Sequence, residues 1–229
     1  MKLNLPFDHV CVIVHCQYPQ RQQLMKEQIQ KINAEDITEF RYVDSMPNVF
    51  KPISDNIFHN DRCKLPGNEY VNNNCLSCYL NHYWAIKTSY ERGYNNVLIL
   101  EDDIFWIDDL NMIQQTFDNI PKDYKMIKFS QQLHTVNNST MYLFPNGDNG
   151  IQEFHKEYID YKSWGSAGYM LSREGMKELI DIYNSEIMPA DNIMYKLNNK
   201  NEIYITKYQI LLFSPLCCQS NIDKLNYSN

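Results

Sequence analysis

The sequence lacks three features that would assign a protein to a class at once. It has no polybasic run, because its 21 lysines and arginines are scattered among 28 acidic residues, for a formal net charge of -7. It has no apolar run near the roughly 20 residues that a membrane-spanning helix needs. It also shows no internal repeat and no low-complexity tract. We therefore expect neither a nucleic-acid partner nor a transmembrane segment.

The N-terminus also lacks the continuous apolar core of a signal peptide. Its short apolar segment is interrupted by Pro6, Asp8 and His9. A signal peptide needs an unbroken apolar stretch after its positively charged start. We therefore expect a cytoplasmic protein.

Seven cysteines make an odd number in a chain for which no export signal is expected. This favours reduced thiols over a disulfide framework. Cys75 and Cys78 form a CxxC pair, but a zinc site would need further ligands from Cys63 or from Cys217 and Cys218. Ordinary buried or half-buried thiols are the favoured interpretation.

The 44% of hydrophobic residues can fill a core, and apolar runs of strand length alternate with segments of helical periodicity. This alternation predicts an α/β fold with a mainly parallel sheet flanked by helices. We expect one domain over residues 1–229, with a nucleotide-sugar half up to about residue 110 and an acceptor half over 111–229. The expected strands are residues 9–14, 40–44, 97–100, 124–129, 142–144, 168–171, 203–205 and 210–213; the expected helices are 22–33, 75–92, 108–120 and 173–184, with a long loop over 45–74.

The strand expected at residues 97–100 is followed directly by Glu101, Asp102 and Asp103. In open α/β sheets, ligands bind at the carboxyl ends of the strands. If the strand continued, Glu101 and Asp103 would lie on one side and Asp102 on the other. Two carboxylates on one face could share Mn²⁺ or Mg²⁺ with substrate phosphates. The alternative is that the three acids begin the next helix, where negative charge complements the helix dipole.

Four blocks of sequence support the first interpretation. They are VCVIVHCQYPQR, Tyr42-Val43-Asp44-Ser45, SCYLNHYWAIKTSYERGYNNVLILEDD and WGSAGYMLSREGMKELI. In this order and spacing they resemble glycosyltransferase family 25, which contains lipooligosaccharide and collagen hydroxylysine galactosyltransferases. The third block is the most specific, since it resembles the family's Gly-Cys-x-x-Ser-His helix followed by Leu-Glu-Asp-Asp.

The resemblance is incomplete at three positions. Cys78 and His82 of the helix motif are kept, but Ser77 stands in place of its glycine and Asn81 in place of its serine. Val14 stands where the family usually has an asparagine in the first strand. These changes leave open a degenerate relative that binds a nucleotide sugar without turnover. The three retained acids favour an active enzyme.

The resemblance implies a GT-A type fold with a Rossmann-like nucleotide half. It also implies a UDP-sugar donor, a Mn²⁺ (or Mg²⁺) cofactor and transfer of galactose or glucose, with inversion, to a glycan or a hydroxylysine-type acceptor. The acidic triplet then takes the place of the Asp-x-Asp motif of such enzymes. A metal-dependent phosphohydrolase using the same acidic strand end is a further alternative.

Each candidate site residue has an assigned role. Asp103 and Glu101 are the expected metal ligands, and Asp191 is the expected base that deprotonates the acceptor. The expected donor-binding residues are Arg21, Asp44, His82, Glu101, Asp102, Trp164, Gly165 and Gln219, with Ser220 beside the last.

Simpler structural roles compete with several of these assignments. Arg21 could be an exposed arginine at a helix start, and Asp44 a turn residue. His82 and Trp164 could be ordinary core residues, and Asp191 could cap a helix over residues 192–197.

Overall fold

The computed structural model describes residues 2–15, 18–43, 73–130, 132–134, 140–141, 154–156, 163–164, 166–185, 190–198, 203–206 and 209–214. Its helices are α1 (Pro19–Lys31), α3 (Asn73–Glu91), α4 (Leu110–Asp118), α5 (Arg173–Ser185) and α6 (Ala190–Asn198), with a 3₁₀ turn η1 (Glu35–Ile37). Its strands are β1 (His9–His15), β2 (Thr38–Val43), β3 (Asn96–Glu101), β4 (Ile104–Trp106), β5 (Met126–Lys128), β6 (Gln132–His134), β7 (Thr140–Met141), β8 (Phe154–Lys156), β9 (Ser163–Trp164), β10 (Gly168–Ser172), β11 (Ile203–Thr206) and β12 (Leu211–Phe213).

A seven-stranded sheet in the order β2-β1-β3-β10-β5-β11-β8 forms the centre of the molecule. The strands β2, β1, β3, β5 and β11 run in one direction, whereas β10 and β8 run in the opposite direction. The predicted mainly parallel α/β sheet is therefore confirmed. The sequence pattern did not predict that β10 runs antiparallel between β3 and β5.

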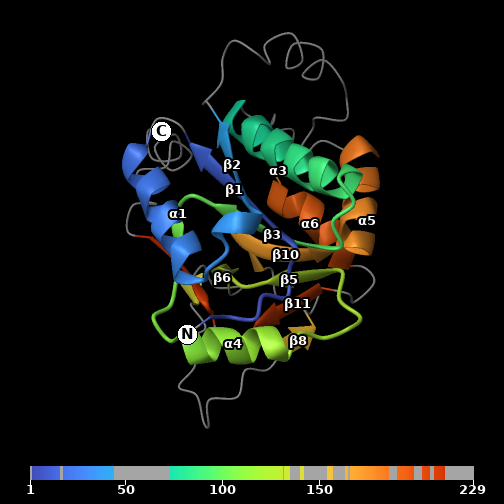
Figure 1. Ribbon diagram of the computed structural model, residues 1–229. Coiled ribbons are helices and arrows are strands. Elements are labelled where there is room, and N and C mark those ends of the chain that lie inside the picture. The colour runs from blue at the N-terminus through green and yellow to red at the C-terminus, as the bar shows by residue number, and fades with distance from the viewer. Residues whose placement is uncertain are drawn as a thin grey trace.

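Helices cover both faces of this sheet, as Figure 1 shows. Val10, Val12 and Val14 of β1 face a core shared with α1 and α4. Cys11 and Ile13 face a second core shared with α3, α5 and α6. Successive side chains of a strand point to opposite faces, so an unbroken apolar run such as β1 fits a sheet buried on both sides.

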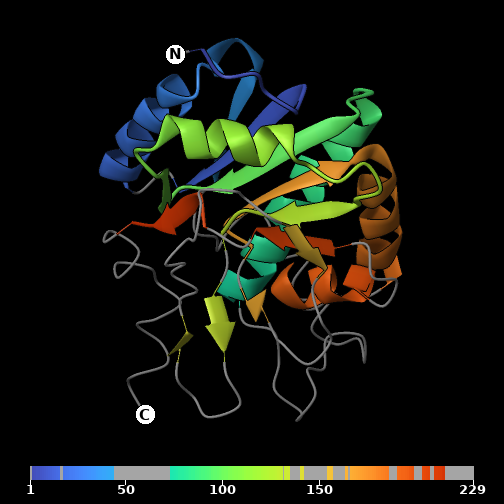
Figure 2. The ribbon, with the colours of Figure 1, turned by 90° about the horizontal axis from the view of Figure 1, so that it is seen from below.

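Two smaller sheets lie outside the central one. β6 pairs with β7 and β9, and Figure 2 shows β6 standing apart from the seven strands. β4 pairs with β12 in an antiparallel ladder in which Ile104 faces Phe213 and Trp106 faces Leu211. Because β4 follows the acidic residues directly, this ladder holds the late segment of the chain beside them.

Local sequence signals explain the ends of several helices. Gly93 has φ 87°, a left-handed conformation that ends α3 where the sequence predicts it. The hydroxyl of Ser172 accepts from the backbone N–H of Gly175 at 3.1 Å and caps α5, as expected. Asp109 caps α4 in the same way by accepting from Asn111 and Met112.

Most expected elements are present, with shifted ends. α3 begins at Asn73, inside the range expected as a loop, and α4 is shorter than residues 108–120. The strand expected at 142–144 and residues 45–72 of the expected loop lie outside the described residues. The division into a nucleotide-sugar half and an acceptor half stays a prediction. In the part of the chain that the structure describes, no helix is both long and apolar enough to cross a bilayer.

Gly175 allows α5 to lie close to the backbone of Lys125, the residue before β5. A Cβ at this position would lie 2.2 Å from the carbonyl oxygen of Lys125, a backbone atom that cannot turn away. We expect Gly175→Ala to lower the free energy of unfolding by about 1–3 kcal/mol, the usual cost of an added methyl in a packed site. Chemical denaturation measures this. Lys177→Ala, on an exposed position of the same helix, should change stability little, and equal stability of the glycine variant would contradict the packing.

Candidate active site

The acidic triplet lies partly on β3 and partly in the turn after it. β3 ends at Glu101, and Asp102 and Asp103 form a turn that leads into β4. The alternative in which the three acids begin a helix is therefore wrong. The assumption that the strand continues through Asp103 is also wrong, although Glu101 and Asp102 do point to opposite sides of the sheet.

Asp102 is held by protein groups on both of its carboxylate oxygens. Oδ1 accepts from Nη1 of Arg21 at 2.9 Å, and Oδ2 accepts from the backbone N–H of His15 at 2.6 Å. Burial raises the pKa of Asp102 above its ordinary value, although the N–H of His15 and the charge of Arg21 oppose that shift. The two side chains thus join α1 and β1 to the end of β3.

This pairing bears on two sequence-based assignments. Arg21 is 5% exposed, so the alternative of an exposed helix-start arginine is wrong. Asp102 is also 5% exposed, and both of its oxygens already have protein donors. Direct donor contacts by Arg21 and Asp102 stay predictions, while the geometry gives the two residues a structural role.

A structural role for Arg21 can be measured without any substrate. Arg21→Met leaves the Asp102 carboxylate buried without its cation, which typically costs about 3–5 kcal/mol of stability. We expect a loss of that order in chemical denaturation of the metal-free, nucleotide-free protein. Lys87→Met, which removes an exposed pair with Glu91, should change stability little. Unchanged stability combined with lost nucleotide affinity would instead place Arg21 in the donor site.

Glu101 lies on the opposite side, toward α3. Its Oε1 accepts from the hydroxyl of Ser166 at 2.6 Å and lies 3.0 Å from Nε2 of His82. Nδ1 of His82 is in turn 2.7 Å from the hydroxyl of Tyr169. Burial by itself raises the pKa of Glu101, but the bonds from His82 and Ser166 outweigh it and the net pKa is lowered. The fold therefore stabilises the charged form of Glu101 through His82 and Ser166.

His82 matches the description of a satisfied core histidine, while its donor-binding role stays a prediction. It is 1% exposed and hydrogen-bonded on both ring nitrogens, as a satisfied core histidine should be. It also touches Glu101, so it borders the acidic site. Ser166 and Tyr169 were not singled out from the sequence, although both belong to the fourth block, WGSAGYMLSREGMKELI.

Asp103 has the least compensated charge of the triplet. Its Oδ1 is buried and has no hydrogen-bond partner among the residues that the structure describes, while its backbone carbonyl accepts from the N–H of Ser214 at 2.6 Å. Burial and the negative charges of Glu101 and Asp102 raise the pKa of Asp103 from 3.8 to about 7. A cation bound here would remove this penalty.

The raised pKa of Asp103 predicts how stability changes with pH. Folded Asp103 keeps a proton that the unfolded chain releases between pH 3.8 and about 7, so the free energy of unfolding falls as the pH rises through this window. Asp103→Asn has no such titration. We expect its stability relative to the unsubstituted protein to rise by up to about 1.4 kcal/mol per pH unit in this window and then to level off.

Thermal unfolding in a chelating buffer at about pH 5 and about pH 8 measures this difference. Asp108→Asn is the matched control, because Lys31 lowers the pKa of Asp108 and the substitution should slightly destabilise the protein. If the stability of Asp103→Asn relative to the unsubstituted protein did not rise between the two pH values, the buried environment assigned to Asp103 would be contradicted.

The other candidate residues are placed unevenly. Asp191 is the second residue of α6 rather than the residue before it, so the expected N-cap role is wrong. α6 packs through Ile193, Met194 and Leu197 against the core that α3 also covers, which is the side of the sheet toward which Glu101 turns. Trp164 lies in β9. The side chain of Trp164, and residues Asp44, Gly165, Gln219 and Ser220, lie outside what the structure describes, so their roles stay predictions.

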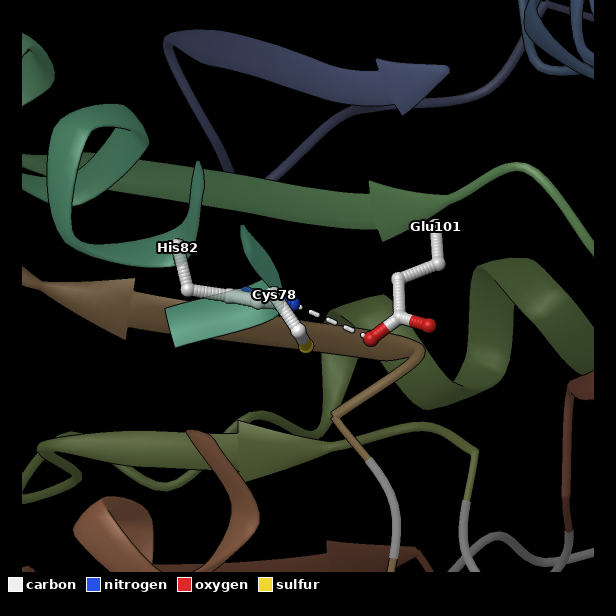
Figure 3. A group of neighbouring side chains, drawn as sticks. All are labelled: Cys78, His82 and Glu101. Atoms are coloured by element: carbon white, nitrogen blue, oxygen red, sulfur yellow. Dashed lines mark hydrogen bonds and ion pairs between the residues drawn. The ribbon is translucent and has the colours of Figure 1, made fainter. Parts of the chain in front are cut away.

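Three potential metal ligands of different chemistry, one of them Glu101, meet at the end of β3. The Sγ of Cys78, a ring nitrogen of His82 and a carboxylate oxygen of Glu101 all lie within 4.8 Å of one another. Figure 3 shows Cys78 and His82 reaching from α3 toward the carboxylate at the end of β3. The described residues hold one such group, and it does not include Asp103. Glu101 and Asp103 as ligands of one shared ion thus stay a prediction.

Comparison with known protein families assigns the chain to a family of enzymes. The chain matches the profile of glycosyltransferase family 25, described as LPS biosynthesis proteins, over residues 8–194. This match places the chain among the glycosyltransferases, enzymes that transfer a sugar to an acceptor. Within that class the chain belongs to glycosyltransferase family 25.

Solved structures show only remote similarity. Mouse xyloside xylosyltransferase 1 is 7% identical with a TM-score of 0.44, over 86% of this chain and 84% of that protein. The glycosyltransferase GlyE of Streptococcus pneumoniae is 11% identical with a TM-score of 0.40, over 85% of this chain and 44% of that protein. A glycosyltransferase involved in the glycosylation of the major capsid of PBCV-1 is 9% identical with a TM-score of 0.35, over 77% of this chain and 65% of that protein.

This chain therefore spans less than two thirds of the length of GlyE and of the PBCV-1 capsid glycosyltransferase. With TM-scores below 0.5, these structures say nothing about its activity. Comparison with curated proteins finds no significant match. The observed sheet and the family assignment together confirm the expected GT-A type α/β fold.

Proposed function

We propose that this protein is a metal-dependent, inverting hexosyltransferase. It moves galactose or glucose from a UDP-sugar to a hydroxyl of a glycan, of the lipopolysaccharide type that the family description names. The observation that supports the metal and the donor is the buried Oδ1 of Asp103 at the carboxyl end of β3, for which the described part of the chain supplies no hydrogen-bond partner. Ligands of open α/β sheets bind at this edge.

The residues present fit a hard divalent cation. Asp103 offers a carboxylate oxygen that no donor among the described residues occupies, and Glu101, two residues before it, keeps 28% of its side chain exposed. Mn²⁺ and Mg²⁺ take one or two carboxylates together with substrate phosphates. When bound, the ion would stabilise the negative charge of the departing diphosphate.

The remaining chemistry belongs to side chains of the protein. His82 and Ser166 hold the carboxylate of Glu101, so Glu101 is fixed before a donor arrives. Inversion needs a base on the acceptor side, and Asp191 is our candidate because α6 places it on the same face of the sheet as Glu101. A fixed carboxylate needs little reorganisation during the reaction.

A transfer assay tests the proposal. The protein is incubated with Mn²⁺ and a panel of nucleotide sugars, and released nucleoside diphosphate is measured with and without glycan acceptors. We expect release that requires both Mn²⁺ and an acceptor, with UDP-galactose or UDP-glucose as donor. Release that ignores the acceptor and the sugar would indicate the phosphohydrolase, and donor binding without release would indicate the degenerate binding module.

Two matched substitutions test the role of Asp103 in this assay. Asp103→Asn should lower kcat/KM by more than about 100-fold, because losing a direct ligand should exceed the roughly 10–100-fold cost of losing an outer-shell partner. Asp108→Asn, in an exposed position five residues later, should leave it nearly unchanged. Equal activity of the two variants would remove Asp103 from the site.

A further inference from the structure

We propose that Cys78, His82 and Glu101 form a binding site for Zn²⁺, which differs from the hard-cation site at Asp103 but shares Glu101 with it. Cys78 and His82 are four residues apart on α3 and therefore lie on the same face of that helix. Glu101 reaches the same point from the end of β3 (Figure 3). The ligand atoms of all three lie within 4.8 Å of one another.

The chemistry of the three ligands selects zinc over manganese or magnesium. Zn²⁺ takes thiolate, imidazole and carboxylate ligands at about 2.0–2.3 Å, which places neighbouring ligand atoms of a tetrahedron roughly 3.3–3.7 Å apart. Nε2 of His82 and Oε1 of Glu101 are already 3.0 Å apart. A small rotation of the Cys78 side chain would complete the site. Mn²⁺ and Mg²⁺ prefer oxygen ligands and have no comparable use for a thiolate.

The groups around the cluster orient its ligands as outer-shell groups do in known zinc sites. The hydroxyl of Tyr169 lies 2.7 Å from Nδ1 of His82, which leaves Nε2 to face the cluster. The hydroxyl of Ser166 donates to Oε1 of Glu101 at 2.6 Å. Such partners fix the orientation and the tautomer of the ligands, and their loss typically weakens metal binding about 10–100-fold.

The site has three protein ligands, and two of them keep exposed surface in the part of the chain that the structure describes. Cys78 is half-buried and Glu101 is partly exposed, whereas His82 is buried beneath them. An ion can therefore enter past Cys78 and Glu101. Three protein ligands leave the fourth tetrahedral position to water or to a small ligand.

The shared ligand gives the zinc site a consequence for transfer, which rests on the proposed function. Glu101 is also the expected neighbour of Mn²⁺ and the donor. Zinc bound to Cys78, His82 and Glu101 removes that carboxylate from the donor site. Zinc thus inhibits Mn²⁺-supported transfer in proportion to its occupancy of this site.

Metal binding to the reduced full chain, without nucleotide, tests the site directly. Zn²⁺ is titrated against a chromophoric chelator, and Co²⁺ is used as a probe whose charge-transfer absorption reports a thiolate ligand. We expect one ion per chain, a thiolate band, and a loss of affinity of at least about 100-fold in Cys78→Ser. Tyr169→Phe keeps all three ligands and should weaken binding about 10–100-fold.

Two cysteine controls exclude other thiols. Cys11→Ser changes a free, buried cysteine of β1 outside the cluster and should bind zinc normally. Binding that survives Cys78→Ser, or that is lost in Cys75→Ser alone, overturns the assignment. Circular dichroism of each variant verifies its fold, and Cys78, being half-buried, is the substitution that the fold tolerates best.

The activity measurement separates this proposal from the proposed function. Zinc should inhibit Mn²⁺-supported release of nucleoside diphosphate in the unsubstituted protein and at least about 10-fold less effectively in Cys78→Ser. Equal inhibition of both proteins overturns the regulatory consequence. A protein that binds zinc but transfers no sugar refutes the proposed function alone, and one that transfers sugar without binding zinc refutes this inference alone.

Discussion

Three consecutive carboxylates at the end of β3 repel one another, and the site depends on how the fold separates their charges. Asp102 is turned toward α1, where Arg21 and the backbone of His15 hold it. Glu101 is turned toward α3, where His82 and Ser166 hold it. Asp103 is left without such compensation, because its buried Oδ1 has no donor among the described residues. The fold thereby concentrates the uncompensated charge on one carboxylate instead of spreading it over three.

This separation relates stability to function. A carboxylate with a raised pKa is unfavourable for the metal-free protein, and the same property favours a bound cation. Asp102 differs from Asp103, because both of its carboxylate oxygens already accept hydrogen bonds from groups of the protein. Its structural role can therefore be complete without a ligand. Neighbouring residues of like charge therefore serve different purposes, one holding the helix and the strand together and the other available to bind. The divergence follows from the end of β3 at Glu101, because Asp102 and Asp103 lie in the turn that leads into β4.

Sequence periodicity was sufficient for most of the elements around the site. The apolar runs predicted β1 and β3, Gly93 predicted the end of α3, and Ser172 predicted the start of α5. The pattern also predicted that Glu101 and Asp102 diverge. These features are local, since each depends on a few adjacent residues.

The partners of the acids could not be predicted in the same way. Arg21 contacts Asp102 across 81 positions of the chain, and Ser166 contacts Glu101 across 65. Such contacts depend on strand order, and the local pattern does not specify that order. A charged residue near a helix start is ordinarily solvated, so the burial of Arg21 was not expected. The pairing of Cys78 with His82 was visible as helical spacing, but its proximity to Glu101 required the sheet.

The reversed direction of β10 has a consequence for how this enzyme can diversify. Because β10 runs against β3, its first residues rather than its last lie at the edge where β3 ends, and the backbone N–H of Glu101 bonds to the carbonyl of Ala167. The connection from β9 therefore arrives beside the acidic turn. Lengthening or shortening that connection changes the chain next to Glu101 and leaves the register of β10 against β3 as it is, so the surroundings of Glu101 can vary while the sheet stays the same.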